Sequence, residues 1–300
     1  MTETTDRRAL IVLIAGACAI GWSPILVRLG GAGPAATGFW RLAFALPWLL
    51  MLVGRPGGGG DAKAALKSPE IWLSGLLFAG DLGFWHYGIH FTSVANATVL
   101  SNMTPILVVI VGWLAFQERP KPVFLLGMTL ALAGSIGMAL FKAGVAGHPP
   151  SFVGDIFSAL TAVWYGGYFL VVRRARGQFS TGAVMLGSSL PGLALLILAA
   201  IILKEPLTPV TLGGWAALAA LGFVHASGQG SIAWALGRLP TALAAVVVLV
   251  QPVVAAVLGW LIFGEAMTPL QASAAALALA GVAVAQASAG RPKPMEANNG

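Results

Sequence analysis

A few polar side chains interrupt the long apolar segments of this 300-residue chain, and their natural chemistry is the binding of a polar or charged solute. Asp81 is the clearest case, because a carboxylate at the centre of a bilayer costs at least about 2.5–3.5 kcal/mol to insert. It should therefore face water or a polar partner. Either Asp81 binds a cationic group or carries a proton, or it joins neighbouring helices in protonated or hydrogen-bonded form.

Other polar and aromatic side chains lie near the same depth, counted at about 1.5 Å per residue along each helix. His225 and Gln229 are one turn apart, and Trp85 shares a helix face with Asp81. The N–H of Trp164 needs a polar partner at that depth. The competing interpretation is packing or hydrogen bonding between helices. The predicted solute-binding residues are Trp22, Asp81, Trp85, Ser101, Asn102, Trp164, Tyr168, His225, Gln229 and Gln251.

Two prolines, Pro105 and Pro252, lie within apolar segments at equivalent places in the two halves of the chain. A proline inside a helix frees the carbonyl four residues earlier, here that of Ser101 and of Val248, and kinks the helix. We expect these carbonyls to be available to a solute and the kinks to act as hinges. Static kinks are the alternative.

Three charged residues, Arg28, Arg41 and Asp155, are predicted near the outer ends of their segments. They could form an ion pair that changes as a gate opens and closes. The alternative for the two arginines is that they extend their charged heads to the membrane surface.

The composition indicates that lipid surrounds these segments, because 58% of residues are hydrophobic and only 9% are charged. A soluble domain is about 25% charged. The net charge of +7 is typical of cytoplasmic loops of a membrane protein rather than of nucleic-acid binding. The single cysteine and the lack of a Cys/His cluster predict no metal site and no cofactor.

Apolar segments of about 20 residues match the hydrocarbon thickness of a bilayer, and the chain has ten of them. The predicted fold class is therefore an all-α polytopic membrane protein with ten transmembrane helices. The predicted spans are 9–29, 35–54, 71–90, 94–116, 121–141, 153–173, 182–203, 211–236, 241–263 and 268–288.

The basic residues predict the orientation of these spans, since cytoplasmic loops are rich in Lys and Arg. With the N-terminus inside, thirteen of the 17 basic residues fall on the inner side and only Lys142 and Lys204 on the outer side. We therefore expect both termini to be cytoplasmic.

An internal repeat relates the two halves, because residues 105–134 recur as 252–281 at an offset of 147. Gly112-Trp113 corresponds to Gly259-Trp260, and Gly134 to Gly281. Since five is odd, the second set of five helices must insert upside down, which makes an inverted repeat with halves 1–147 and 148–300. Repeated halves of this kind are typical of transporters.

Small residues recur at helical spacing in 121–141 (Gly127, Ala131, Gly134) and in 268–288 (Ala274, Ala278, Gly281). Such spacing lets helix backbones approach closely. The sequence leaves open whether this packing lies within one chain or between two subunits of a homodimer.

These motifs together resemble the drug/metabolite transporter superfamily, in its ten-helix EamA-type branch. The resemblance is carried by Gly21-Trp22-Ser23-Pro24, Phe39-Trp40-Arg41-Leu42, Trp85-His86-Tyr87, Gly154-Asp155 and the repeated proline segments. It covers nearly the whole chain. It implies an inner-membrane exporter of amino acids or related metabolites, with no ATP site and with a central cavity formed by spans 1, 3, 4, 6, 8 and 9.

We therefore predict a secondary transporter for a small-molecule substrate, working by alternating access as a facilitator or uniporter of aromatic and other apolar amino acids. A proton-coupled exchanger using Asp81 is the alternative. An intramembrane enzyme is disfavoured because the chain lacks a zinc-protease motif, a nucleophile elbow and a paired aspartate site, so no catalytic residue is predicted. A membrane scaffold or receptor is the remaining possibility.

Overall fold

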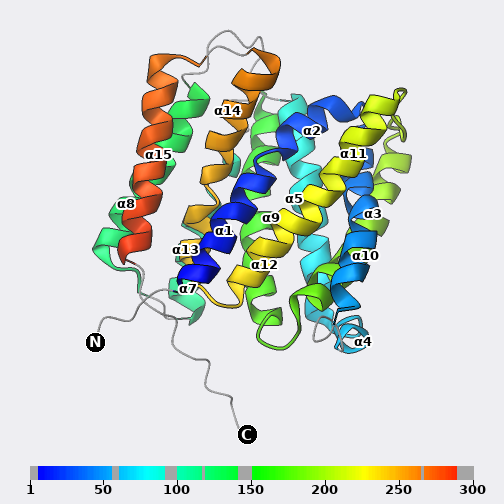
Figure 1. Cartoon of the computed structure of the whole chain (residues 1–300), viewed down its shortest axis with the longest axis horizontal. Helices are drawn as coiled ribbons and strands as arrows, with labels where there is room; N and C mark the ends of the chain where they lie inside the picture. The colour runs from blue at the N-terminus through cyan, green and yellow to red at the C-terminus, as the bar shows by residue number, and fades with distance from the viewer. Residues whose placement is uncertain are drawn as a thin grey trace, which may run out of the picture.

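The computed structural model describes residues 6–55, 61–91, 100–116, 119–140, 151–264 and 267–288. Every regular element in these ranges is a helix, and the helices stand side by side in one bundle (Figure 1). The start of α1 (Arg7–Ile20) and the end of α15 (Pro269–Ser288) lie at the same end of the bundle, as an even number of crossings requires.

The helices follow the chain in a simple order. They are α1 (Arg7–Ile20), α2 (Ser23–Gly30), α3 (Pro34–Val53), α4 (Ala62–Ala65), α5 (Pro69–Phe91), α7 (Thr104–Phe116), α8 (Pro122–Leu140), α9 (Phe152–Ala175), α10 (Thr181–Ile202), α11 (Leu212–Val224), the π-helix η1 (His225–Gln229), α12 (Gly230–Leu236), α13 (Thr241–Val247), α14 (Val250–Phe263) and α15 (Pro269–Ser288).

Seven helical stretches of the described chain are long and apolar enough to cross a membrane. They are Arg7–Gly30, Pro34–Val53, Pro122–Leu140, Phe152–Ala175, Thr181–Ile202, Thr241–Phe263 and Pro269–Ser288.

The other three predicted spans also contain helices, but each differs from a simple apolar rod. Helix α5 has 23 residues, and Asp81 and His86 lower its hydropathy. Helix α7 has 13 residues and follows residues 92–99, which lie outside the described part. Helices α11 and α12 are separated by the π-helix η1, so neither spans alone.

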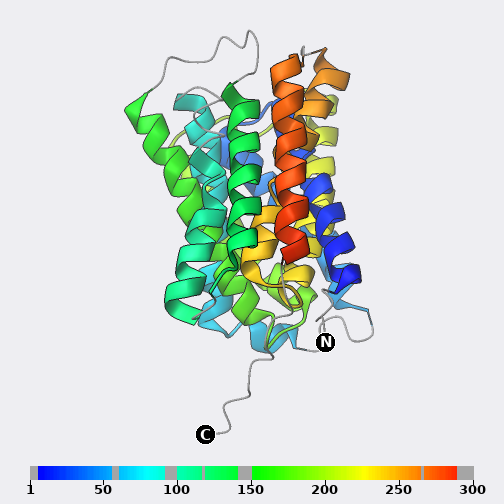
Figure 2. The ribbon, with the colours of Figure 1, turned by 90° about the vertical axis from the view of Figure 1, so that its left-hand side faces the viewer.

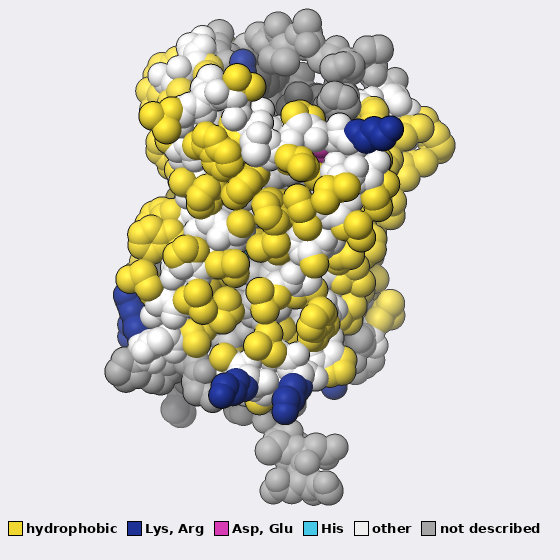
Figure 3. Space-filling view, turned by 90° about the vertical axis from the view of Figure 1, so that its right-hand side faces the viewer, with side chains coloured by type: hydrophobic (Ala, Val, Ile, Leu, Met, Phe, Trp, Pro, Cys, Tyr) yellow, Lys and Arg dark blue, Asp and Glu magenta, His cyan; other side chains and the backbone are white. Residues whose placement is uncertain are grey.

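The side chains exposed around the middle of the bundle are mainly hydrophobic, as contact with lipid requires. Figure 3 shows hydrophobic side chains over the middle of one face, with Lys and Arg toward its ends. Repeat partners have matching environments there, since Trp113 of α7 is 51% exposed and Trp260 of α14 is 52% exposed. An exposed tryptophan at both places is what a repeated lipid-facing surface requires.

The two stripes of small residues pack against each other within one chain. Helices α8 and α15 lie side by side (Figure 2), and a Cβ added at Gly134 would come 2.3 Å from the Ala278 nitrogen. At Gly281 it would come 2.2 Å from the Ala131 nitrogen. These stripes are therefore covered without a second subunit, and they give no support to a homodimer.

The same contact displays the inverted relation of the two halves. Gly134 meets Ala278, and its repeat partner Gly281 meets Ala131, the repeat partner of Ala278. The two helices run antiparallel, because Gly127 near the start of α8 meets Ala285 near the end of α15. An exchange of partners with reversed direction is what a twofold axis in the membrane plane produces.

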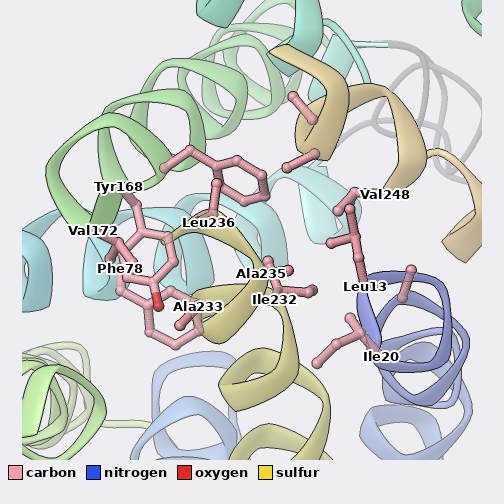
Figure 4. Packing of buried hydrophobic residues seen from close by; sticks show 14 of the residues in the cluster. Leu13, Ile20, Phe78, Tyr168, Val172, Ile232, Ala233, Ala235, Leu236 and Val248 are labelled. Atoms are coloured by element: carbon pink, nitrogen blue, oxygen red, sulfur yellow. The ribbon is translucent and has the colours of Figure 1, made fainter. Parts of the chain in front are cut away.

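The core has α12 near its centre. Figure 4 shows side chains of α12 between those of α1 and α9, with Ile232 and Leu236 buried among Leu13 and Tyr168. This packing fixes the elements that carry the polar residues described next.

We expect Gly281→Ala to lower the stability of the purified protein, because the new methyl group would overlap the α8 backbone. Overpacking of this kind costs about 1–3 kcal/mol. Gly83→Ala is the matched control, since nothing lies within 4 Å of a Cβ added there. Thermal unfolding in detergent, followed by circular dichroism, measures both; an unchanged midpoint for Gly281→Ala would contradict the close packing.

Candidate functional site

Four of the predicted membrane spans are interrupted near their middle and do not form one continuous α-helix. Helix α1 ends before Gly21 and α2 begins at Ser23, α13 ends at Val247 and α14 begins at Val250, and turn residues 102–103 precede α7. The fourth break is the π-helix η1, which carries His225 and Gln229. Breaks of this kind are tolerated inside a membrane where the backbone is covered by protein or lines a cavity.

Three of these breaks have a proline in the first turn of the second helix. These are Pro24 in α2, Pro105 in α7 and Pro252 in α14. Proline suits this position because its missing N–H would have no partner there. The break at Trp22 was not predicted, although Pro24 was its signal, and the π-helix has no proline to mark it.

The carbonyls freed by Pro105 and Pro252 already have donors. The Thr104 hydroxyl donates to the Ser101 oxygen at 3.1 Å, and the Gln251 N–H donates to the Val248 oxygen at 2.9 Å. Each carbonyl oxygen therefore already accepts one hydrogen bond, and its binding to a solute stays a prediction. The breaks themselves lie where the prolines placed them.

A group of seven side chains from α3, α5, α9 and η1 meets in the interior, and we call it the central cluster. It consists of Arg41, Phe78, Asp81, Tyr165, Tyr168, His225 and Gln229. Phe78 lies at its middle, with its ring centroid 4.9 Å from that of Tyr168 and 5.1 Å from that of His225. Asp81, Tyr168, His225 and Gln229 were predicted members.

Arg41 points into the interior and does not extend its charged head to the membrane surface. Its side chain is only 4% exposed, and its guanidinium carbon lies 5.9 Å from the Phe78 ring centroid. It interacts electrostatically with Asp81, Tyr165 and Tyr168. Its place in the central cluster was not predicted, because depth along the segment does not show which face of α3 points inward. Arg41 is seven residues from the start of α3.

Asp81 is half-buried in α5 and faces the same interior as Arg41. The two residues interact electrostatically, but they form no salt bridge at 4.0 Å or less. An acidic and a basic side chain therefore face the same interior without a direct contact.

Several buried nitrogen atoms around this space have no hydrogen-bond partner among the described residues. They are Arg41 Nε, Trp164 Nε1, His225 Nδ1 and Gln229 Nε2. Buried polar groups without partners are rare in folded proteins and point to a missing ligand or water. Gln229 lies beside the hydroxyls of Tyr165 and Tyr168, whose rings are stacked with centroids 6.1 Å apart.

Trp164 lies next to the central cluster rather than in it. Its ring covers the backbone at Gly80, one residue before Asp81. Its centroid is 5.6 Å from that of Phe84, which in turn lies 5.0 Å from that of Phe157. Trp164, Phe84 and Phe157 therefore form a row of aromatic rings beside the part of α5 that carries Asp81, and their contact with a solute stays a prediction.

Open space exists inside the bundle beside these groups. Gly230, directly after η1, is buried, yet no atom lies within 4 Å of a Cβ built there. Gly83, two residues after Asp81, is half-buried and likewise has no neighbour within 4 Å of an added Cβ. A buried glycine with nothing against it marks room that the protein itself does not fill.

The remaining predicted residues lie away from the cluster. Trp22 is 41% exposed at the α1–α2 break, and Trp85 lies against His86 with ring centroids 5.0 Å apart. Asn102 and Gln251 are half-buried at their breaks, and within the described ranges their amide nitrogens have no partner. Arg28 packs 4.2 Å from the Phe263 ring centroid, and Asp155 lies in the first turn of α9.

Polar contacts join the two halves at the end of the bundle where α1 begins. Arg174 Nε lies 2.6 Å from Glu70 Oε1, and the Ser180 hydroxyl donates to Asp61 at 2.7 Å. Burial raises the pKa of the Asp61 carboxyl, but hydrogen bonds from Ser180 lower it further, so the net pKa lies below its ordinary value. This contact is therefore present at neutral pH and is lost as pH falls through that lowered pKa.

A second set of contacts joins the halves at the opposite end. Glu205, between α10 and α11, accepts hydrogen bonds from the Ala36 N–H at 3.0 Å and from the Tyr87 hydroxyl. Its carboxylate thus lies at the N-terminus of α3, where negative charge is favoured. These contacts could not be predicted from the sequence, because they join residues more than 100 positions apart in the chain.

Metal chemistry has no support in the geometry. In the part of the chain that the structure describes, no three His, Cys, Asp or Glu side chains come close enough to hold an ion.

Comparison with known proteins decides the family. The EamA-like transporter family matches residues 7–140 and 152–286, which is most of the chain and falls in two stretches. The chain belongs to the EamA-like transporter family. It is therefore a multi-pass membrane protein that transports a small molecule, and the predicted fold class of repeated helical halves is confirmed.

Individual relatives agree with this family. The pseudopaline exporters CntI of two Pseudomonas aeruginosa strains, UCBPP-PA14 and PAO1, are each 24% identical over 207 residues, covering 69% of this chain and 70% of theirs. A crystal structure of another protein has the same fold, with a TM-score of 0.76 and 24% identity over 94% of this chain and 98% of that one.

We expect a cysteine at Gly83 to react with a water-soluble thiol reagent, because the space beside it is open. The only natural cysteine, Cys18, is first changed to serine. Leu114→Cys is the matched control, since this side chain is 69% exposed on an apolar helix and should face lipid. Labelling of Leu114→Cys but not of Gly83→Cys would contradict a hydrated interior.

Proposed function

We propose that this EamA-family protein is a secondary transporter of the bacterial inner membrane that exports aromatic and other apolar amino acids or related metabolites. The observation that carries the proposal is the central cluster, in which buried donors lack partners beside open space at the broken centre of an apolar bundle. A solute with both polar and apolar parts fits such a site. The family and the exporter relatives support outward transport of a metabolite.

The aromatic residues favour a substrate with an apolar or aromatic side chain. Phe78, Tyr165 and Tyr168 belong to the central cluster, and Trp164 with Phe84 extends the apolar wall. Aromatic rings add about 0.5–1.5 kcal/mol per ring pair beyond the burial of area. A side chain that packs among them would therefore be distinguished from a short polar one.

The transport cycle that we propose is alternating access between the halves 1–147 and 148–300, whose boundary lies outside the described residues. The two termini would face the cytoplasm, as the basic loops predict. Each end of the bundle carries contacts between the halves, Glu70–Arg174 at one end and Glu205–Tyr87 at the other. Opening one end would break one set and leave the other in place, which supports this scheme.

The mechanism that we propose is uniport, driven by the substrate gradient. Proton-coupled exchange is the second candidate, and Asp81 is the observation that favours it, since a carboxylate in mid-span can carry a proton. We do not include a homodimer in the proposal, because the small-residue stripes of α8 and α15 are already paired within one chain.

The experiment that tests transport is flux into proteoliposomes, with a panel of competing amino acids and with or without a pH gradient. Uniport predicts that a pH gradient drives no accumulation of substrate in the wild type or in Asp81→Asn. The two proteins would then differ only in the rate of downhill flux. Proton coupling predicts accumulation in the wild type that is lost in Asp81→Asn while downhill flux survives. That second pattern would make the uniport proposal wrong.

We expect Trp164→Ala to weaken the preference for large apolar substrates, because it removes the ring that covers Gly80 and contacts Phe84. The apparent affinity for tryptophan, phenylalanine and methionine should fall by about tenfold, corresponding to about 1.4 kcal/mol. Trp113→Ala on the outer surface is the control. Unchanged competition by all three amino acids in Trp164→Ala would count against an aromatic site.

A further inference from the structure

The central cluster contains one basic and one acidic side chain, Arg41 and Asp81, that make no direct contact. Arg41 is 4% exposed, and no described residue accepts a hydrogen bond from its Nε. A buried guanidinium without an acceptor is costly, and such groups are normally paired. Its neighbours are the face of Phe78, the tyrosines of α9 and, further away than a salt bridge, Asp81.

The geometry matches a ligand that carries both charges. A guanidinium binds a carboxylate through two parallel hydrogen bonds, and a carboxylate accepts hydrogen bonds from an ammonium group. A solute with an ammonium and a carboxylate group could contact Asp81 and Arg41 at once. The direct pair would not need to form, because each charge would meet its partner on the solute.

The neighbouring donors also favour a carboxylate. Trp164 Nε1 and Gln229 Nε2 are buried N–H donors without acceptors in the described structure. Both belong to elements that border the Arg41–Asp81 space, since Trp164 covers Gly80 and Gln229 lies beside the tyrosines. A carboxylate would supply acceptor oxygens for these donors.

We propose that Arg41 binds the carboxylate group of a zwitterionic substrate while Asp81 binds its ammonium group. This inference rests on the proposed function and adds the chemical class of the solute: an α-amino acid or amino-acid derivative with both groups free. Selection against solutes that lack the carboxylate follows, because they leave the buried guanidinium without a partner.

The first test uses the wild-type protein in proteoliposomes with labelled phenylalanine as the transported probe. The first competitor is unlabelled phenylalanine. Phenylalaninamide and phenethylamine lack its free carboxylate, and 3-phenylpropanoate lacks its ammonium group. We expect phenylalanine to compete at least about tenfold better than each of the other three, because a hydrogen-bonded charge is lost each time. Equal competition by phenylalaninamide would overturn the inference.

The second test compares Arg41→Lys and Arg41→Gln. We expect the KM for phenylalanine to rise at least about tenfold in Arg41→Gln and less in Arg41→Lys, which keeps the charge but not the two-pronged donor. Inhibition by phenethylamine should stay unchanged in both. Arg55→Gln is the matched control, since Arg55 is exposed just after the end of the same helix. A rise in KM that is equal for phenylalanine and phenethylamine would overturn the role of Arg41.

The two proposals fail in different ways. If the wild type moves no amino acid in either direction, the proposed function is wrong. If it moves phenylalanine but does not distinguish it from its amide, transport stands and only the assignment to Arg41 and Asp81 is wrong. The wild-type panel decides this even where the Arg41 variants do not fold.

Discussion

Hydrocarbon offers no hydrogen bonds, and this absence is the constraint on which the rest of the structure depends. Every backbone or side-chain polar group within the spans must find a partner inside the protein or face a space that holds one. Most of the bundle satisfies the constraint with continuous helices. The four interrupted spans do not, and one of the interruptions, the π-helix η1, carries His225 and Gln229 of the central cluster. The site is therefore where the constraint is met by something other than regular helix.

The close packing at one edge complements the looseness at the centre. Helices α8 and α15 approach until backbone atoms touch, through Gly134, Gly281 and their alanine partners. Near Gly83 and Gly230 the protein leaves space unfilled. Small residues thus have two opposite uses in one chain. Between helices they permit contact, and beside the polar cluster they keep room for a solute.

The sequence predicted the fold better than the site, for physical reasons. The lengths of the apolar segments, the positions of the basic residues and the 147-residue offset are all properties of position along the chain. The spans and the repeat could therefore be predicted from the sequence. Asp81, Trp164 and His225 were found because depth along a helix is also a one-dimensional quantity. Arg41 was missed because its environment depends on which face of α3 points inward, and that is decided by packing against α5 and α10.

The backbone breaks illustrate the same limit. Three of the four breaks have a proline in the helix that follows. Two were predicted from Pro105 and Pro252, and Pro24 could have predicted the third. The two freed carbonyls each accept one hydrogen bond from a nearby turn, from the Thr104 hydroxyl and from the Gln251 N–H, and the prolines alone do not predict these donors. The π-helix at His225 has no sequence marker, since it depends on how α11 and α12 fit around α1 and α3.

The pairing of α8 with α15 also sets an order on biogenesis. Helix α15 follows α8 by more than 120 residues in the chain, so it is made long after its partner in the first half. Until α15 has been inserted, the glycine face of α8 lacks the backbone that fills it in the folded protein. A chain that stops before α15 would therefore keep that face without its partner.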